Sequence, residues 1–237
     1  MNLREAVNEV LSHIPNRNGE YFCFPDVHLL MQGFRCPQIR EILNNSAGNF
    51  PDGIGVAWAL KYAKKARFKG RVRGTDFFLE LCCNAAKENL SIFFFGNTKE
   101  TLSKLISRVK SLYDRINIVG AISPPFHPIS EGEDDFMIRQ INAANPDILF
   151  VSLGAPKQEE WMATHKGKIK ALQFGVGAAF DFIINNVKPA PKCMQEAGLE
   201  WLFRLPQEPI KTIKRISLFP EFLIRVLIEN INGQRKR

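Results

Sequence analysis

Short apolar runs alternate with longer amphipathic segments through much of this chain. The runs are rich in Ile, Leu, Val and Phe, as buried strands are, and they are Ile92–Phe95, Ile116–Val119, Ile148–Leu153 and Leu172–Val176. Their starts are about 25 to 30 residues apart, which is the length of a strand plus a crossover helix. The pattern predicts an α/β fold with a doubly wound, mostly parallel, Rossmann-like sheet.

A glycine closes or follows each of these runs. These glycines are Gly96, Gly120, Gly154 and Gly177. In open α/β sheets the ligand binds beyond the carboxyl ends of the strands, where glycines let backbone amides approach it closely. The sequence therefore predicts a ligand cleft along that edge of the sheet.

The N-terminal part of the chain is less regular. Its pattern predicts a helix near residues 3–12, an aromatic strand at Tyr21–Phe24, and helices near residues 37–45 and 54–65. Two junctions in this part carry the turn residues that precede helices, and helix N-termini beside glycines favour anions.

The junctions are the segments Asn49–Gly55 and Arg71–Asp76. In the first, a proline and a glycine interrupt any earlier helix, which places Asp52 at or just before a helix N-terminus. In the second, Thr75 is expected to cap the helix that follows. Both junctions are predicted to lie near a bound anion.

The C-terminal part shows helical spacing and then a basic amphipathic pattern. Helical spacing links Met194, Ala197, Trp201, Leu202 and Leu205. Beyond Pro206 the apolar positions are largely set apart from lysines and arginines, which predicts a pair of helices that lie on a membrane rather than cross it. We divide the chain into an α/β domain at residues 1–205 and a basic amphipathic appendage at residues 206–237.

The formal charge of +8 is concentrated in the last part of the chain. Residues 201–237 carry eight Lys or Arg and three Asp or Glu, a net charge of +5. Such a segment attracts polyanions, and nucleic acid, anionic lipid and diphosphate groups all qualify on charge alone. The apolar content of Phe219–Ile231 favours an anionic membrane surface over nucleic acid, and an amphipathic tail also favours self-association into a homo-oligomer.

The cysteines indicate a reducing compartment. There are five, Cys23, Cys36, Cys82, Cys83 and Cys193, with no CxxC pair, and the start of the chain lacks the apolar core of a signal peptide. No uninterrupted apolar run reaches about 18 residues. We therefore expect a cytoplasmic protein that is peripheral to a membrane.

Several polar residues near the predicted cleft are candidates for chemistry. Asp52 is positioned to act as a general base, with the alternative that it only caps a helix. Lys157, Gln158 and Glu159 follow a strand end, where Lys neutralises phosphate and Gln bonds a sugar or a base edge. The alternative for them is a solvated first helical turn.

The segment Gly175–Asp181 only partly matches a dinucleotide-binding fingerprint. Phe180 stands where the third glycine is required, which disfavours a nicotinamide-dependent oxidoreductase but leaves Asp181 as a candidate ribose ligand or a helix cap. The histidines show no metal-binding spacing and no Asp-x-Asp triplet occurs, so we expect no metal and no cofactor. A leaving diphosphate would then be stabilised by Arg, Lys and helix dipoles.

Segments in order along the chain resemble the WecG/TagA/CpsF family of bacterial glycosyltransferases. The matching segments are Pro51–Gly55, Arg71–Asp76, Phe94–Asn97, Ser152–Trp161, Gly175–Phe182, and Ala197–Leu205 followed by Glu208–Pro209. The loop Ser123–Phe126 resembles the exopolysaccharide branch of this family more than its teichoic-acid branch. Several separated motifs in the same order are far more specific than any one of them.

This resemblance implies an inverting transfer of a hexose or N-acetylhexosamine-type sugar from a UDP-sugar to a saccharide on a membrane polyprenyl diphosphate. Residues 1–205 would then bind the nucleotide sugar, and the appendage would dock on the inner face of the plasma membrane. Asp52 matches the catalytic base of the family. The matching or adjacent candidate substrate-binding residues are Gly53, Arg73, Thr75, Asp76, Gly96, Asn97, Gly154, Lys157, Gln158, Glu159, Gly175 and Asp181.

The resemblance also implies roles for basic residues near the C-terminus. Arg204, Lys211, Lys214 and Arg215 correspond to cations that contact the membrane and the acceptor diphosphate. Two segments depart from the family pattern, Cys23–Asp26 and Asn185–Lys188, and leave the donor sugar open. A non-catalytic, membrane-associated nucleotide-binding scaffold is therefore kept as the alternative to an enzyme.

Overall fold

The computed structural model describes residues 2–62 and 70–235, without the side chains of Lys192, Glu196, Lys211 and residues 229–235. The strands are β1 (Tyr21–Cys23), β2 (Gly48–Asn49), β3 (Ser91–Gly96), β4 (Asn117–Ile122), β5 (Ile148–Ser152) and β6 (Leu172–Gly175). The helices that precede β6 are α1 (Leu3–His13), the 3₁₀ turn η1 (Ile14–Asn16), α2 (Val27–Arg35), α3 (Pro37–Asn44), α4 (Ile54–Tyr62), α5 (Gly74–Glu88), α6 (Lys99–Leu112), α7 (Glu131–Ala144) and α8 (Lys157–Thr164). Those that follow it are α9 (Ala179–Ile183), α10 (Lys192–Glu196), α11 (Glu200–Arg204), α12 (Pro209–Ile216) and α13 (Phe219–Arg235).

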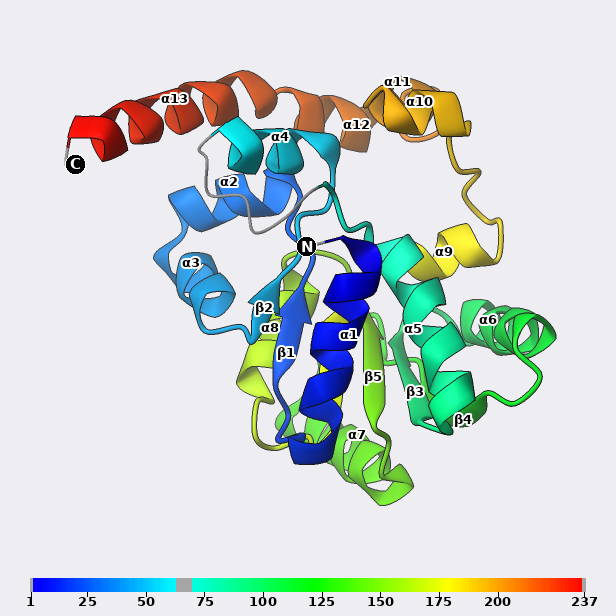
Figure 1. The fold of residues 1–237 in the computed structure, drawn as a ribbon. Coiled ribbons are helices and arrows are strands. Elements are labelled where there is room, and N and C mark those ends of the chain that lie inside the picture. Colours follow the sequence, from blue (N-terminus) through cyan, green and yellow to red (C-terminus); the bar gives the residue numbers. More distant parts are fainter. Residues whose placement is uncertain (1, 63–69, 236–237) are drawn as a thin grey trace.

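The strands form one six-stranded sheet in the order β2-β1-β6-β5-β3-β4, and all its pairings are parallel (Figure 1). The register pairs Phe94 of β3 with Phe150 of β5, and Phe150 with Phe174 of β6. Parallel strands need crossover connections, and the helices between the strands supply them. The predicted parallel α/β fold is confirmed.

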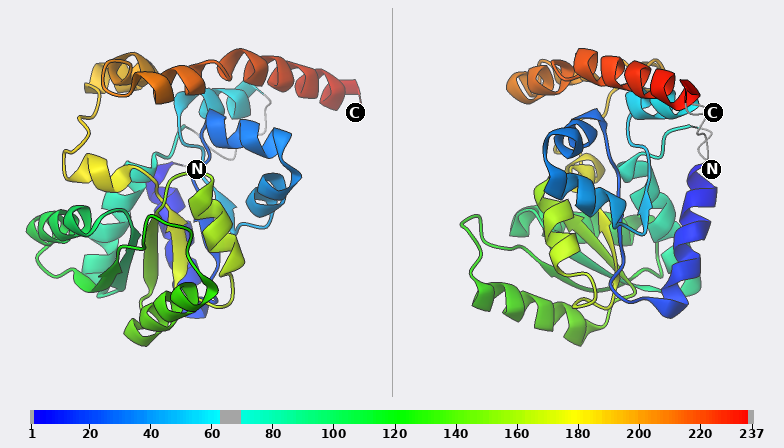
Figure 2. Two further views of the ribbon diagram at one scale, coloured as in Figure 1. Left: turned by 180° about the vertical axis from the view of Figure 1, so that it is seen from behind. Right: turned by 90° about the vertical axis from the view of Figure 1, so that its left-hand side faces the viewer.

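Helices cover both faces of the sheet, so successive strand residues enter two separate cores (Figure 2). On β3, Phe94 packs into the core beneath α1, α5 and α6, whereas Phe93 and Phe95 pack toward α7 and α8. Side chains alternate in this way because consecutive residues of a strand point to opposite faces. The stacked and tilted rings of Phe22, Phe77 and Phe174 fill much of the first core.

Some elements differ from the sequence predictions. Strand β4 continues past Gly120 to Ile122, because beyond a register irregularity at Ile92/Phe93 it stays paired with β3 as far as Phe95. Helix α2 was not predicted, although the Asp26 side chain caps it by accepting from Leu29 N–H (2.8 Å). The single helix expected across residues 194–205 is two short ones, α10 and α11.

The C-terminal helices α10 to α13 form a layer across one end of the domain (Figures 1 and 2). Phe222 of α13 is buried against Met31 and Ala59, and Arg35 forms an ion pair with Glu221. The predicted pair of helices after Pro206 is confirmed as α12 and α13. Within the described residues, no helix has the length and apolar character needed to cross a membrane.

Candidate functional site

A cleft of about 930 Å³ lies at the carboxyl edge of the sheet, where the strand-end glycines predicted it. One wall comes from the segments after β1 and β6, which carry Asp26 and Asp181. The opposite rim comes from Glu200 and Arg204, in the segment that leads into the appendage, and from Arg215 of the appendage itself. Segments far apart in the sequence therefore enclose one cavity, which is large enough for a nucleotide-sized ligand.

Asp52 lies in this cleft and is held by two neighbouring segments. Its backbone N–H donates to Pro25 O (3.1 Å), and Val72 N–H donates to Pro51 O (2.8 Å). Its carboxylate accepts a hydrogen bond from the backbone N–H of Gly74, the first residue of α5. The carboxylate thus caps a helix other than the one that follows it, and it remains open to the cleft.

The electrostatic surroundings of Asp52 suit a general base. Burial and then the charge of Asp26 raise the pKa of Asp52 to about 6, while Arg73, the Gly74 N–H and Arg204 act in the opposite direction. A carboxylate with this pKa is ionised at neutral pH and is far more basic than an exposed one. Asp52 is therefore equipped to accept a proton from a hydroxyl group.

Glu200 joins the arginines on both sides of the cleft. Its carboxylate lies 2.5 Å from Arg71, 3.6 Å from Arg73 and 3.7 Å from Arg204. Arg71 and Arg73 lie in an irregular segment before α5, and both reach this one carboxylate. Arg204 also lies over the Phe182 ring at 4.9 Å. Cations are thereby held next to Asp52, where they can stabilise a negative charge.

Asp181 is oriented by two asparagines. Asn97 Nδ2 donates to one of its oxygens (3.1 Å) and Asn186 Nδ2 to the other (3.3 Å). Asn97 adopts a left-handed backbone conformation (φ 61°), and its N–H donates to Ser152 O (3.1 Å). This geometry links the ends of β3 and β5 to the carboxylate on α9. Asp181 keeps acceptor capacity for ligand hydroxyl groups.

Gln158 and Glu159 are buried at the start of α8, with exposed fractions of 4% and 0%. Gln158 Nε2 donates to Glu159 Oε1 (2.8 Å) and to Gly175 O (2.9 Å). Both amide protons are therefore used, and Gln158 Oε1 and Glu159 Oε2 have no partner. Burial, partly offset by the Gln158 N–H, raises the pKa of Glu159 to about 7. These two residues do lie in the first turn of α8, but the alternative that this turn is solvated is wrong for them, because their side chains are buried.

The structure brings most of the predicted site residues to the cleft. Its lining includes Asp52, Arg73, Thr75, Asn97, Gly154, Lys157, Gln158, Glu159, Gly175, Asp181, Arg204 and Arg215. Gly53, Asp76, Gly96 and Lys214 do not line it. The side chain of Lys211 lies outside the described part of the chain. Thr75 is not the expected cap, because α5 already begins at Gly74, whose N–H donates to the Asp52 carboxylate, and the N-cap position is Arg73.

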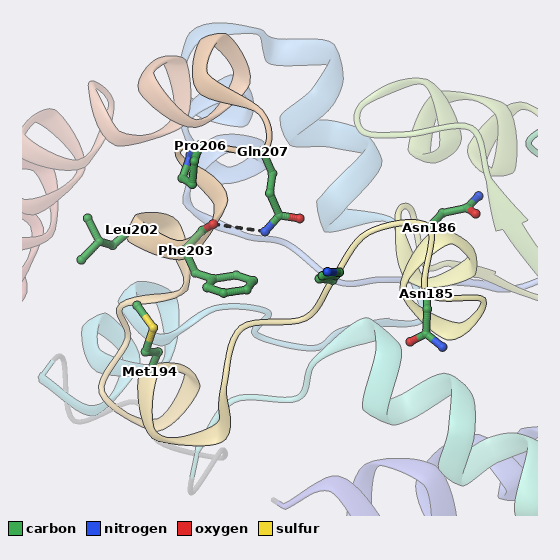
Figure 3. A pocket seen from close by; sticks show the side chains of 8 residues that line it. Asn185, Asn186, Met194, Leu202, Phe203, Pro206 and Gln207 are labelled. Carbon is green, nitrogen blue, oxygen red and sulfur yellow. Dashed lines mark hydrogen bonds between the residues drawn. The ribbon is translucent and has the colours of Figure 1, made fainter.

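The two segments that depart from the family pattern have different positions. Asp26 lines the cleft, whereas Asn185, Asn186 and Lys188 line a second hollow of about 620 Å³ beside it (Figure 3). Figure 3 shows that the opposite side of this hollow is formed by the C-terminal helices, including Phe203. Val187 of the same segment lines the cleft that contains Asp52, so the second departure lies between the two cavities.

Sequence reasoning missed three contributors to the site, Asp26, Phe182 and Glu200. Glu200 lay within a recognised motif, but no spacing rule connects it with arginines more than 120 positions earlier. Asp26 was noted only as a departure from a pattern. Among the described residues, no group of three or more His, Cys, Asp and Glu side chains is placed to hold a metal ion.

A cleft at the carboxyl edge of a parallel sheet, with a basic carboxylate beside fixed arginines, defines an enzyme that acts on an anionic substrate. A sequence model described as the glycosyl transferase WecG/TagA/CpsF family matches residues 1–236. The chain belongs to this family and is a glycosyltransferase. The family assignment made from the motifs is confirmed. It excludes the two alternative functions, a nicotinamide-dependent oxidoreductase and a non-catalytic nucleotide-binding scaffold.

A curated relative from Bacillus subtilis (strain 168) is 34% identical to this chain over 196 residues. It is named N-acetylglucosaminyldiphosphoundecaprenol N-acetyl-beta-D-mannosaminyltransferase. The alignment covers 81% of this chain and 73% of the relative. The similarity therefore extends over most of both proteins.

Proposed function

We propose that this chain transfers a neutral hexose or N-acetylhexosamine from a UDP-sugar, with inversion, to a saccharide linked to polyprenyl diphosphate. The observation that carries this proposal is the position of Asp52, a carboxylate of raised pKa on which Arg73 and Arg204 act. The name of the Bacillus relative supports the class of acceptor, a sugar on undecaprenyl diphosphate. The product would serve the synthesis of a cell-envelope polymer or an exopolysaccharide.

In the proposed reaction Asp52 removes the proton of the acceptor hydroxyl. The oxygen attacks the anomeric carbon of the donor, and the bond from that carbon to the UDP oxygen breaks on the opposite side, which inverts the anomeric centre. The electron pair leaves with UDP, and the proton stays on Asp52 until solvent removes it. Arg73, Arg204 and Arg215, which line the cleft, stabilise the charge on the leaving diphosphate.

The remaining residues of the cleft would hold the nucleotide sugar. Asp181, oriented by Asn97, accepts hydrogen bonds from hydroxyl groups, and Gln158 presents its unpartnered oxygen to a donor group of the ligand. Lys157 is exposed at the first position of α8, where both its charge and the helix N-terminus attract phosphate.

The appendage would dock on an anionic membrane and bring the lipid-linked acceptor to the cleft. Ile210 and Ile213 of α12 are 71% and 58% exposed, and Lys214 and Arg215 are exposed on the same helix. Exposed aliphatic side chains beside cations are typical of helices that lie in a membrane interface. Arg215 also lines the cleft, so docking and acceptor binding would involve the same helix.

A panel of UDP-sugars tests this function. Each is incubated with the protein and a short-chain lipid diphosphate that carries N-acetylglucosamine, and released UDP and the glycosylated product are measured. One donor is expected to give product whose new linkage has the opposite anomeric configuration. UDP binding without transfer from any donor would contradict the proposed substrates, and a retained configuration would contradict the mechanism.

A further inference from the structure

Helix α4 carries an exposed apolar face that the proposed chemistry does not use. Ile54, Trp58 and Tyr62 are spaced four residues apart and therefore lie along one side of the helix. They are 43%, 46% and 42% exposed, whereas Val56 and Ala59 on the inner side are buried. Single exposed apolar residues are common, but a row of three large ones on a nine-residue helix is not.

Two members of this row form an aromatic pair at the surface. The rings of Trp58 and Tyr62 are stacked, with centroids 5.4 Å apart and an interplanar angle of 12°. Tryptophan and tyrosine are enriched where membranes meet water, because each ring has an apolar body and one polar group. The chemistry of the pair suits the headgroup region of a bilayer better than bulk water.

The appendage and the segment that leads into it both pack tightly against α4. A Cβ atom on Gly55 would lie 2.8 Å from the Phe219 ring, and a Cβ atom on Gly198 would lie 2.7 Å from Ile54. Both glycines therefore mark places where the two parts of the chain approach too closely for a side chain. Figures 1 and 2 show α4 beside α12 and α13 in every view, at the same end of the molecule.

We propose that α4 is a second lipid-contacting element, in which Trp58 and Tyr62 enter the headgroup region of a bilayer when the appendage docks. This inference rests on the membrane docking proposed above. Lys61 is exposed in the last turn of α4 and adds positive charge toward anionic headgroups. The apolar face of α4 extends the surface offered by α12 and α13.

A contact through α4 would connect the membrane with the catalytic loop. Helix α4 begins two positions after Asp52, and the backbone of that loop is held by Pro25 and Val72. A bilayer in contact with Trp58 would therefore lie near the mouth of the cleft. The reacting hydroxyl of a lipid-linked acceptor has to reach Asp52 while its lipid stays in the membrane. A bilayer near the mouth of the cleft shortens the distance that the acceptor has to span.

Tryptophan fluorescence tests the contact. The chain has three tryptophans, of which Trp161 is buried and Trp201 is 43% exposed, so Trp201→Phe leaves Trp58 as the exposed reporter. Vesicles of phosphatidylcholine and phosphatidylglycerol, with or without brominated acyl chains, are added to this variant. We expect a blue shift and quenching by the brominated lipid. Both changes should be absent when Trp58→Phe is added.

A second pair of variants tests whether the contact contributes to binding. Trp58→Ala combined with Tyr62→Ala should weaken vesicle binding by about tenfold or more, because two apolar rings no longer leave water. The matched control is Phe136→Ala, an exposed aromatic residue (54%) on α7 at the other end of the molecule. Equal binding by both variants would overturn the inference.

The outcomes separate this inference from the proposed function. If the unaltered protein does not sediment with vesicles, the docking of the appendage is wrong. If it does sediment but Trp58 is neither shifted nor quenched, only the role of α4 is wrong. A third outcome is that the emission of Trp58 is already blue-shifted without vesicles and that this shift disappears on dilution. Such a result would show that a second copy of the chain covers this face, and it would also overturn the inference.

Discussion

The carboxylate of Glu200 lies 3.6 Å from the guanidinium of Arg73, and both side chains are largely buried. Arg73 immediately precedes α5, whereas Glu200 begins α11, close to the start of the appendage. The same carboxylate also contacts Arg71 and Arg204. One acidic residue therefore holds α11, which leads into the appendage, beside the cleft and places the arginines next to Asp52.

Glu200→Gln should lower the free energy of unfolding by about 2 kcal/mol, because the partly buried arginines lose a charged hydrogen-bond partner. Thermal unfolding measures the change, and limited proteolysis of residues 184–199 should become faster. Glu100→Gln is the control, since its pair with Lys104 is exposed and contributes little. An equal effect of the two substitutions would contradict the role given to Glu200.

Asp52→Asn should reduce kcat by about 10²- to 10⁴-fold, because the amide cannot accept the proton of the acceptor hydroxyl. UDP affinity, measured by calorimetry, should change little, since the substitution keeps the shape of the cleft. Asp135→Asn removes an exposed carboxylate of α7 and serves as the control. Turnover close to that of the unaltered enzyme would remove Asp52 from the mechanism.

The pH dependence of kcat/KM should show an acid limb with an apparent pKa near 6, because Asp52 is active only when ionised. Asp26→Asn should move this limb to lower pH, since the charge of Asp26 raises the pKa of Asp52. Asparagine is also a good helix cap, so α2 should keep its hydrogen bond from Leu29. An unmoved limb in this variant would show that Asp52 does not control it.

Glu159→Gln should stabilise the protein at alkaline pH and have little effect at acidic pH. The folded-state pKa of Glu159 is raised to about 7, so the neutral form is favoured on folding and the unaltered protein loses stability as pH rises toward and through 7. The difference in unfolding free energy should approach about 3 kcal/mol at pH 8. Melting temperatures of both proteins between pH 5 and pH 8 measure it. A difference that does not grow with pH would contradict the raised pKa.

The hydrophobic periodicity of the sequence was sufficient to predict most strands and helices of the α/β domain, because strand and helix periods are local properties of the chain. The run Ile148–Leu153 is recognisable as a buried strand, since all of its residues except Ser152 are apolar. Helix α2 was missed, although its first turn is capped by Asp26. The cap predicted at Thr75 was wrong because the N–H of Gly74 is satisfied by Asp52, a residue from another segment.

The sequence by itself determined the parallel sheet, the edge at which the ligand cleft lies, the family, and the amphipathic helices at the C-terminus. Tertiary structure alone decided that Glu200 connects Arg73 with Arg204, that Gln158 and Glu159 point inward, and that α4 lies beside the appendage. The reason is physical. Hydrophobic patterns act over a few residues, whereas ion pairs and desolvation depend on which distant segments the folded chain brings together.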